Sequence, residues 1–192
     1  DSPKQRAQLA LAELQRIGAF QRANLVIATP TGTGWVDQES QQALEYLLLG
    51  DVATVSVQYS YFASWLALLT SPEYGVETSR AVFAAVYDHW QRMPKNQRPR
   101  LYLQGLSLGA LNSDLSHDLH QIIGDPYDGA LWSGPPFNTP TWRNLTEMRD
   151  PGSPAWLPRV RDGSAVRFTA QKNHLEDGHA PWGPYRVLFL QY

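Results

Sequence analysis

The chain of 192 residues lacks cysteine entirely, which excludes disulfide bonds, thiolate chemistry and cysteine-ligated metal sites. It also lacks any run of 18 apolar residues, so no stretch of the sequence predicts a membrane-spanning helix. Neither sign of charge dominates. The formal net charge of −2 gives no electrostatic reason to expect nucleic acid or an anionic membrane surface as a partner.

Apolar and aromatic residues are plentiful, at 43% hydrophobic residues with 7 Trp and 9 Tyr, and they suffice for one domain over residues 1–192 with a substantial core. The pattern predicts strands over 25–28, 52–57, 101–103, 129–133, 165–170 and 186–191, and helices over 4–17, 37–49, 78–92 and 108–123. The first helix is expected to place Ala10, Leu14 and Ile17 on one face and to end at Gly18. This alternation predicts an α/β fold with a mostly parallel sheet, helices on both faces and ligands at the carboxyl ends of the strands.

The most informative segment is LYLQGLSLGAL at 101–111, where a short apolar strand leads into a G-x-S-x-G turn and then a helical pattern. Such a turn holds its serine, here Ser107, in a strained conformation with the hydroxyl at the tip. Gly105 and Gly109 leave room beside it, because side chains there would clash across the turn. The amide of Leu108 is then a candidate donor to an oxyanion. A five-residue match can also arise by chance, and the strand and helix around it are what favour the catalytic interpretation.

A second loop with chemical character is TPTGTGW at 29–35, directly after the first predicted strand. Its alternating glycines and threonines expose backbone amides, so Gly32, Thr33 and Gly34 are candidates for a second oxyanion donor, with the Thr33 amide or hydroxyl favoured. A phosphate-binding loop is disfavoured because the Gly-Lys-Ser/Thr ending is absent. An ordinary tight turn remains the simpler alternative.

The sequence offers no convincing base for Ser107. His117 and His120 fall on the helix predicted after the turn and are expected on its surface, whereas His174 and His179 fall in the polar loop NHLEDGH between the last two strands. Neither loop histidine is a favoured base. The loop also contains Glu176 and Asp177, but no helical register supports a metal site. No metal or other cofactor is predicted.

Longer stretches of the chain, among them TPTGTGWVDQES, LYLQGLSLGA, DGALWSGPPFNTPTWRNLT and APWGPYRVLFLQY, resemble the bacterial α/β-hydrolase family with a membrane-embedded N-terminal half and a C-terminal hydrolase domain. The similarity runs from about Ala7 to Tyr192. It implies an α/β-hydrolase fold with Ser107 as nucleophile and TGTGW beside the site. One departure is Leu106, where relatives often carry Glu.

The resemblance also implies features that this sequence does not contain. Family members continue past the segment matching LQY with an Asp and a later His, which would complete a catalytic triad. These residues are expected on sequence beyond Tyr192 or on a complementary chain, unless catalysis has been lost. The resemblance further implies attachment to the bacterial cytoplasmic membrane through another segment. The lack of cysteine favours the periplasmic or outer side for the hydrolase domain, because such a domain has no thiol to be oxidised there. The polar opening DSPKQR is expected of a domain within a longer protein.

Two functions from different classes follow. The first is a serine hydrolase that cleaves a small-molecule or lipid-like ester, with Trp35, Tyr59, Tyr61 and Trp65 lining an apolar acyl pocket. Each of these aromatic residues is equally expected as plain core. The second is a non-catalytic binding or interaction module on a hydrolase scaffold, since a fold does not guarantee its usual activity.

Overall fold

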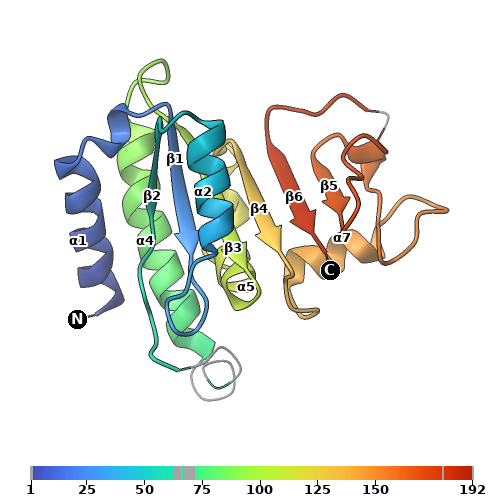
Figure 1. Cartoon of the computed structure of the whole chain (residues 1–192), viewed down its shortest axis with the longest axis horizontal. Helices are drawn as coiled ribbons and strands as arrows, with labels where there is room; N and C mark the ends of the chain where they lie inside the picture. Colours follow the sequence, from blue (N-terminus) through green and yellow to red (C-terminus); the bar gives the residue numbers. More distant parts are fainter. Residues whose placement is uncertain (1, 63–65, 67–71, 179, 192) are drawn as a thin grey trace.

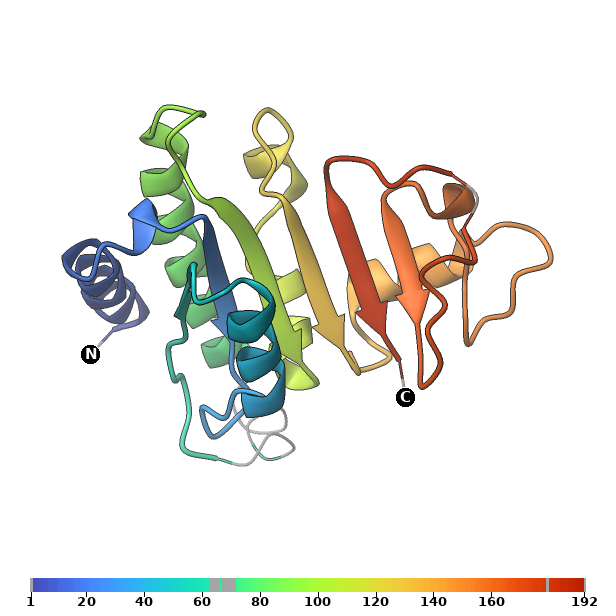
Figure 2. The same cartoon turned by 45° about the horizontal axis from the view of Figure 1, so that its top comes forward.

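Six parallel strands form one sheet in the order β2-β1-β3-β4-β6-β5. The computed structural model describes residues 2–62, 66, 72–178 and 180–191. The strands are β1 (Asn24–Thr29), β2 (Val52–Val55), β3 (Arg100–Leu106), β4 (Gly129–Ser133), β5 (Val166–Thr169) and β6 (Arg186–Leu190). All their carboxyl ends lie along one edge (Figure 2), as expected for a parallel sheet. The predicted α/β fold with a parallel sheet is confirmed.

The core lies on one face of this sheet. Ile27 of β1 pairs in register with Leu103 of β3, and the same row continues through Ala130 and Val187. These four side chains are between 1% and 6% exposed. Because successive side chains of a strand point to opposite faces, the apolar row follows directly from the runs LVIA, LYL, GAL and VLF.

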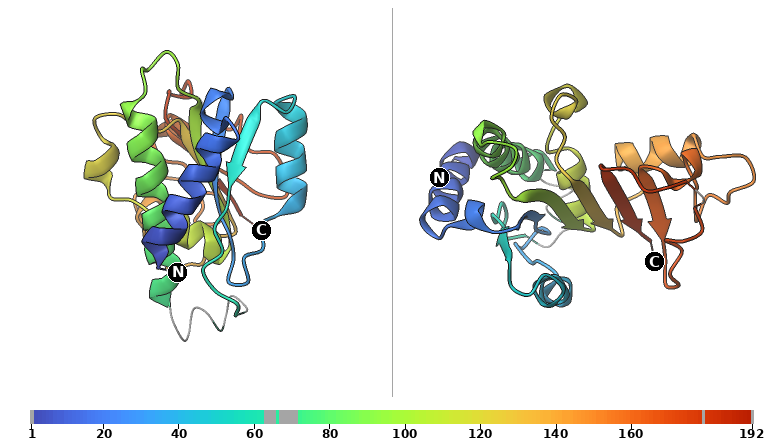
Figure 3. Two further views of the ribbon diagram at one scale, coloured as in Figure 1. Left: turned by 90° about the vertical axis from the view of Figure 1, so that its left-hand side faces the viewer. Right: turned by 90° about the horizontal axis from the view of Figure 1, so that it is seen from above.

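The helices cover the two faces unequally. They are α1 (Pro3–Arg16), α2 (Gln38–Leu47), α4 (Pro72–Arg92), α5 (Leu108–Asp114), α6 (Leu119–Ile122) and α7 (Pro140–Glu147), with short 3₁₀ turns at Ala19–Gln21 and Arg161–Gly163. Figures 1 and 3 show α1, α4, α5 and α7 on one side of the sheet and α2 on the other. No helix among the described residues is long and apolar enough to cross a bilayer. The predicted membrane attachment stays a prediction.

The burial of the strand side chains reflects this unequal coverage of the two faces. Along β3 the side chains alternate strictly: Leu101 and Leu103 are buried, whereas Tyr102 and Leu106 are only partly buried. The same alternation continues on β4 and β6. A parallel sheet is normally covered on both faces. Here every second side chain is only partly buried, so the α2 side of the sheet is the more solvent-accessible one.

Helix boundaries follow local capping chemistry. Helix α1 begins after Ser2, whose hydroxyl accepts a hydrogen bond from Gln5 N while the Gln5 side chain bonds Ser2 N in return. The helix ends at Arg16, one residue before the predicted end, and Ile17 follows it as the C-cap residue, 49% exposed. Helix α4 begins earlier than predicted, at Pro72, where a proline is tolerated in the first turn.

The single helix predicted over 108–123 is in fact two helices. Helix α5 ends at Asp114, and the Ser116 hydroxyl donates to Ser113 O at 2.7 Å. Such side-chain bonding competes with continued helix formation. Asp118 then starts α6 through a reciprocal pair of bonds with Gln121.

The break at this point turns His117 inward, so the expectation of a surface residue is wrong. Its imidazole stacks on Phe83 with ring centroids 4.6 Å apart, and its Nε2 accepts from the Tyr127 hydroxyl at 3.2 Å. Tyr185 donates in turn to Tyr127 at 2.9 Å, which links the loop before β6 to this cluster. Burial lowers the pKa of His117 to about 4.

A buried neutral histidine makes stability depend on pH. Because the pKa of His117 is lower in the folded protein than in the unfolded chain, its contribution is complete above about pH 6.5 and is lost as pH falls toward 4. We expect the free energy of unfolding to drop by roughly 2 kcal/mol between pH 7.5 and 4.5. Urea denaturation at several pH values measures this drop. His117→Gln should flatten the profile, and an equally steep profile in that variant would contradict the assignment.

Candidate active site

Ser107 stands between β3 and α5 with a backbone conformation that L-residues rarely adopt, at φ 53° and ψ −122°. Its amide donates to Ser133 O at the end of β4 at 2.8 Å, and its carbonyl accepts from Ala110 N at 2.9 Å. The residue itself is exposed. These bonds hold the strained residue in place at the carboxyl end of β3, with its side chain accessible.

The glycines on either side of Ser107 are required by close backbone contacts. A Cβ at Gly105 would lie 2.5 Å from the carbonyl carbon and oxygen of Gly109. A Cβ at Gly109 would lie 2.3 Å from Thr29 O and 3.1 Å from Pro30 O. Strand β3, helix α5 and the end of β1 therefore approach one another as closely as backbones can. The steric reason predicted for the two glycines is confirmed.

The amide of Leu108 is available to a ligand. As the first residue of α5 it has no acceptor within the helix, and none of the described residues accepts a hydrogen bond from it. Its side chain is buried in a small cluster with Tyr59 and Leu111. Packing thus fixes the Leu108 side chain, while its N–H has no acceptor among the described residues. This geometry suits the predicted oxyanion donor.

The loop after β1 forms a closed turn next to this helix start. Thr31 N donates to Trp35 O and Gly34 N donates to Thr31 O, both at 2.9 Å. Gly34 has φ 86°, and the Gln58 side chain packs where its Cβ would lie. Gln58 also donates to Thr33 O at 2.9 Å, which fixes the exposed tip. Gly32 is buried and Thr33 is exposed; their oxyanion role stays a prediction.

The aromatic residues predicted to line an acyl pocket lie in different surroundings. Trp35 is 47% exposed and borders a narrow cavity of about 20 Å³ together with Leu106 and Ser133, beside the strained turn. Tyr59 is 8% exposed under α5, and burial raises its pKa to about 12. Tyr61 is 91% exposed. Trp65 lies outside the described residues. Of the described three, Trp35 is the one that shares a cavity with the Ser107 turn.

Sequence reasoning missed a polar cluster in the same cavity. Gln104 Oε1 accepts from the Gln41 amide at 2.6 Å, and Gln104 Nε2 donates to the Ser40 hydroxyl. Asp37 lines the cavity as well and starts α2 without using its side chain as a cap. The signal was a single glutamine inside the apolar strand LYLQGL, on the face that α2 covers.

No described side chain hydrogen-bonds the Ser107 hydroxyl. His120 is exposed on α6, and His117 is engaged in the cluster described above. His174 follows β5 and pairs with Asp177 at 2.8 Å, but β4 and β6 separate β5 from β3 in the sheet. His179 lies outside the described residues. The predicted Asp and His partners of the serine therefore stay a prediction.

The close approach at Gly109 gives a direct test of the turn geometry. Gly109→Ala should lower the free energy of unfolding by about 2 kcal/mol or more, because its Cβ would overlap Thr29 O and the backbone must shift. Gly124→Ala is the matched control, since no atom lies within 4 Å of that added Cβ, and its effect should stay within about 0.5 kcal/mol. Chemical denaturation compares the two variants. Equal stabilities of the two variants would mean that the backbones at Gly109 and Thr29 lie farther apart than in this structure.

The sequence model of the alpha/beta-hydrolase family matches residues 1–192. No curated protein matches the chain. Among solved structures, the chain is similar to one from a study of LipS and LipT, two metagenome-derived lipolytic enzymes, with 12% sequence identity and a TM-score of 0.38 over 88% of this chain and 84% of that chain. Since the family match spans every residue, the chain belongs to the alpha/beta-hydrolase family.

Proposed function

We propose that this chain carries the nucleophile and oxyanion hole of a serine hydrolase that cleaves acyl esters. The observation that carries the proposal is the strained, exposed Ser107 at the carboxyl end of β3. It directly precedes Leu108, whose amide has no acceptor in the part of the chain that the structure describes. Membership of the alpha/beta-hydrolase family supports hydrolysis as the reaction class. A serine nucleophile with an oxyanion donor serves acyl transfer, and esters are among the acyl substrates that such a site cleaves.

The proposed reaction proceeds through an acyl-enzyme. The Ser107 oxygen attacks the ester carbonyl carbon and gives up its proton to a base. The oxyanion that forms accepts a hydrogen bond from the Leu108 N–H. It accepts a second hydrogen bond from Gly32 or Thr33. The intermediate then expels the alcohol, which takes up a proton. Water hydrolyses the acyl-serine by the same route, releasing the acid and restoring the hydroxyl.

The base is the Asp–His pair expected from the family resemblance, and it is not His174. The imidazole of His174 is tied to Asp177 at the far edge of the sheet, and Thr169 Oγ1 accepts from its backbone amide. His174→Ala should therefore leave serine reactivity unchanged. Loss of that reactivity in His174→Ala would show that this histidine is the base after all.

Labelling with a fluorophosphonate probe tests the nucleophile in the full-length protein. We expect covalent labelling that is abolished in Ser107→Ala, because the probe reacts with activated serines. Hydrolysis of p-nitrophenyl butyrate should fall by roughly 10³-fold or more in the same variant. Ser56→Ala, which removes an exposed serine away from the turn, is the control and should label like the wild type.

The outcomes separate the two functions considered for this scaffold. Labelling that persists in Ser107→Ala would remove Ser107 as nucleophile. A full-length protein that folds but neither labels nor hydrolyses the ester would favour the non-catalytic binding module.

A further inference from the structure

Two consecutive residues, Gln58 and Tyr59, contact both elements from which the proposed oxyanion donors come. They lie in the segment that continues from the carboxyl end of β2 (Figure 2). Gln58 contacts the loop after β1, and Tyr59 contacts helix α5. The sequence predicts Tyr59 as part of an acyl pocket and gives no role to Gln58, so these contacts indicate a different task for the pair.

The side chain of Tyr59 packs against the start of α5. It forms one cluster with Leu108 and Leu111, and the three residues are between 5% and 8% exposed. Leu115, the C-cap residue of α5, packs against the same cluster, because residues three and four apart lie on one face of a helix. Within the described chain, Tyr59 is the one member that comes from outside α5 and its cap. The apolar surroundings of the Leu108 side chain, and with them the position of its N–H, therefore depend on this ring.

The hydroxyl group of Tyr59 adds little to this contact. It is buried without a hydrogen-bond partner in the described chain, and so is Nδ2 of Asn112 on α5. Burial raises the pKa of Tyr59 to about 12, and the Asn112 side chain opposes this rise. The hydroxyl is thus neutral at ordinary pH. Removing it breaks no hydrogen bond to the described residues, so the ring is the part of Tyr59 that supports α5.

Gln58 supports the loop after β1 in two ways. Its Nε2 donates to Thr33 O at 2.9 Å, and its Cγ lies 2.7 Å from the point where a Cβ of Gly34 would stand. The same Nε2 donates to Ser60 O at 2.9 Å. The exposed tip of the loop is therefore tied to the segment that also carries Tyr59.

This segment is itself held by two helices. Arg6 of α1 donates from Nη1 to Gln58 O at 3.1 Å and from Nη2 to Thr78 Oγ1 of α4 at 3.0 Å. Thr78 is 2% exposed, so the second bond reaches into the interior. The backbone at Gln58 is thus fixed from the side opposite to the loop and α5.

We propose that Gln58 and Tyr59 are positioning residues for the oxyanion hole. Tyr59 places the Leu108 N–H, and Gln58 places the loop that carries Gly32 and Thr33. The inference rests on the proposed function and adds the residues that set the separation of the two donors.

The spacing of the donors matters more in the transition state than in the bound ester. An oxyanion binds both donors only when they lie within hydrogen-bond distance of one point. A small displacement of either donor weakens that interaction, whereas the ester is held by other contacts before its oxygen becomes charged. Loss of either support should therefore lower kcat and leave KM unchanged.

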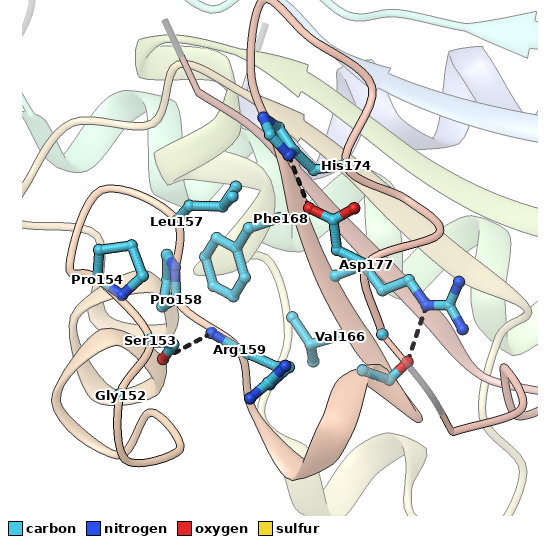
Figure 4. Close-up of a pocket in the computed structure, with 13 residues that line it drawn as sticks. Gly152, Ser153, Pro154, Leu157, Pro158, Arg159, Val166, Phe168, His174 and Asp177 are labelled. Atoms are coloured by element: carbon cyan, nitrogen blue, oxygen red, sulfur yellow. Dashed lines mark hydrogen bonds and ion pairs between the residues drawn. The ribbon is translucent and has the colours of Figure 1, made fainter.

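A matched control comes from the opposite edge of the sheet. Phe168 of β5 lies in the middle of the residues that line a cavity of about 210 Å³ (Figure 4). It is 4% exposed and stacks on Phe189 with ring centroids 5.0 Å apart. Strands β4 and β6 separate β5 from β3, the strand that leads to Ser107. Phe168→Leu therefore removes a buried aromatic ring without changing the surroundings of the turn.

Steady-state hydrolysis of p-nitrophenyl butyrate by the full-length protein tests the proposal. We expect Tyr59→Leu to lower kcat about tenfold with KM within about twofold of the wild type. Tyr59→Phe and Phe168→Leu should keep kcat within about twofold. Gln58→Ala, at an exposed position where the fold tolerates change, should lower kcat about fivefold. Gln91→Ala changes an exposed glutamine near the end of α4 and should have no effect.

An inhibitor that forms an oxyanion separates positioning from general destabilisation. The carbonyl carbon of 1,1,1-trifluoro-2-hexanone bonds to an active-site serine oxygen, whose proton passes to the base, and the carbonyl oxygen becomes the oxyanion. Its inhibition constant should rise in Tyr59→Leu by the factor by which kcat/KM falls. In Phe168→Leu the constant should stay unchanged.

The outcomes distinguish this inference from the proposed function. Ser107-dependent hydrolysis in the wild type, with full activity in Tyr59→Leu or Gln58→Ala, would overturn the inference and leave the function in place. An equal loss in Tyr59→Phe would assign the role to the hydroxyl, and a rise in KM alone would place Tyr59 in the acyl pocket; either result overturns the inference. A wild type without Ser107-dependent hydrolysis would remove the proposed function and the inference with it.

Discussion

The close crossing of three backbone segments at Ser107 is the constraint on which the rest of the structure depends. The end of β1, the end of β3 and the start of α5 meet where Gly105 and Gly109 leave no room for a Cβ. This contact forces Ser107 to a positive φ, and the hydrogen bond from its amide to Ser133 O ties the turn to β4. Strain of this kind persists only where the surrounding structure over-determines it.

The packing below the turn shows how that strain is held. Helix α5 is buried along its whole length, and the Trp132 indole of β4 donates to the Ser113 hydroxyl at 3.0 Å. Asp114 at the end of α5 accepts from Thr141 N, and its burial raises the pKa of the carboxyl. The helix that presents the Leu108 amide is therefore fixed at its C-terminal end by two polar contacts.

Much of this could be predicted from the sequence, because the decisive features are local. The run LYLQGLSLGAL specifies strand, turn and helix within eleven residues, and short apolar runs predict parallel strands. The break after α5 was missed, although Ser116 and the Asp118–Gln121 pair marked it. The inward turn of His117 depended on Phe83 and Tyr127, contacts distant in sequence that no local pattern reveals.

The most direct measurement of the central claim is a crystal structure of the full-length protein inactivated with a small alkyl fluorophosphonate. We expect a phosphorus–oxygen bond to Ser107, with the phosphoryl oxygen accepting a hydrogen bond from the Leu108 N–H, as an oxyanion would. An adduct on another residue, or a phosphoryl oxygen that points away from the start of α5, would contradict it.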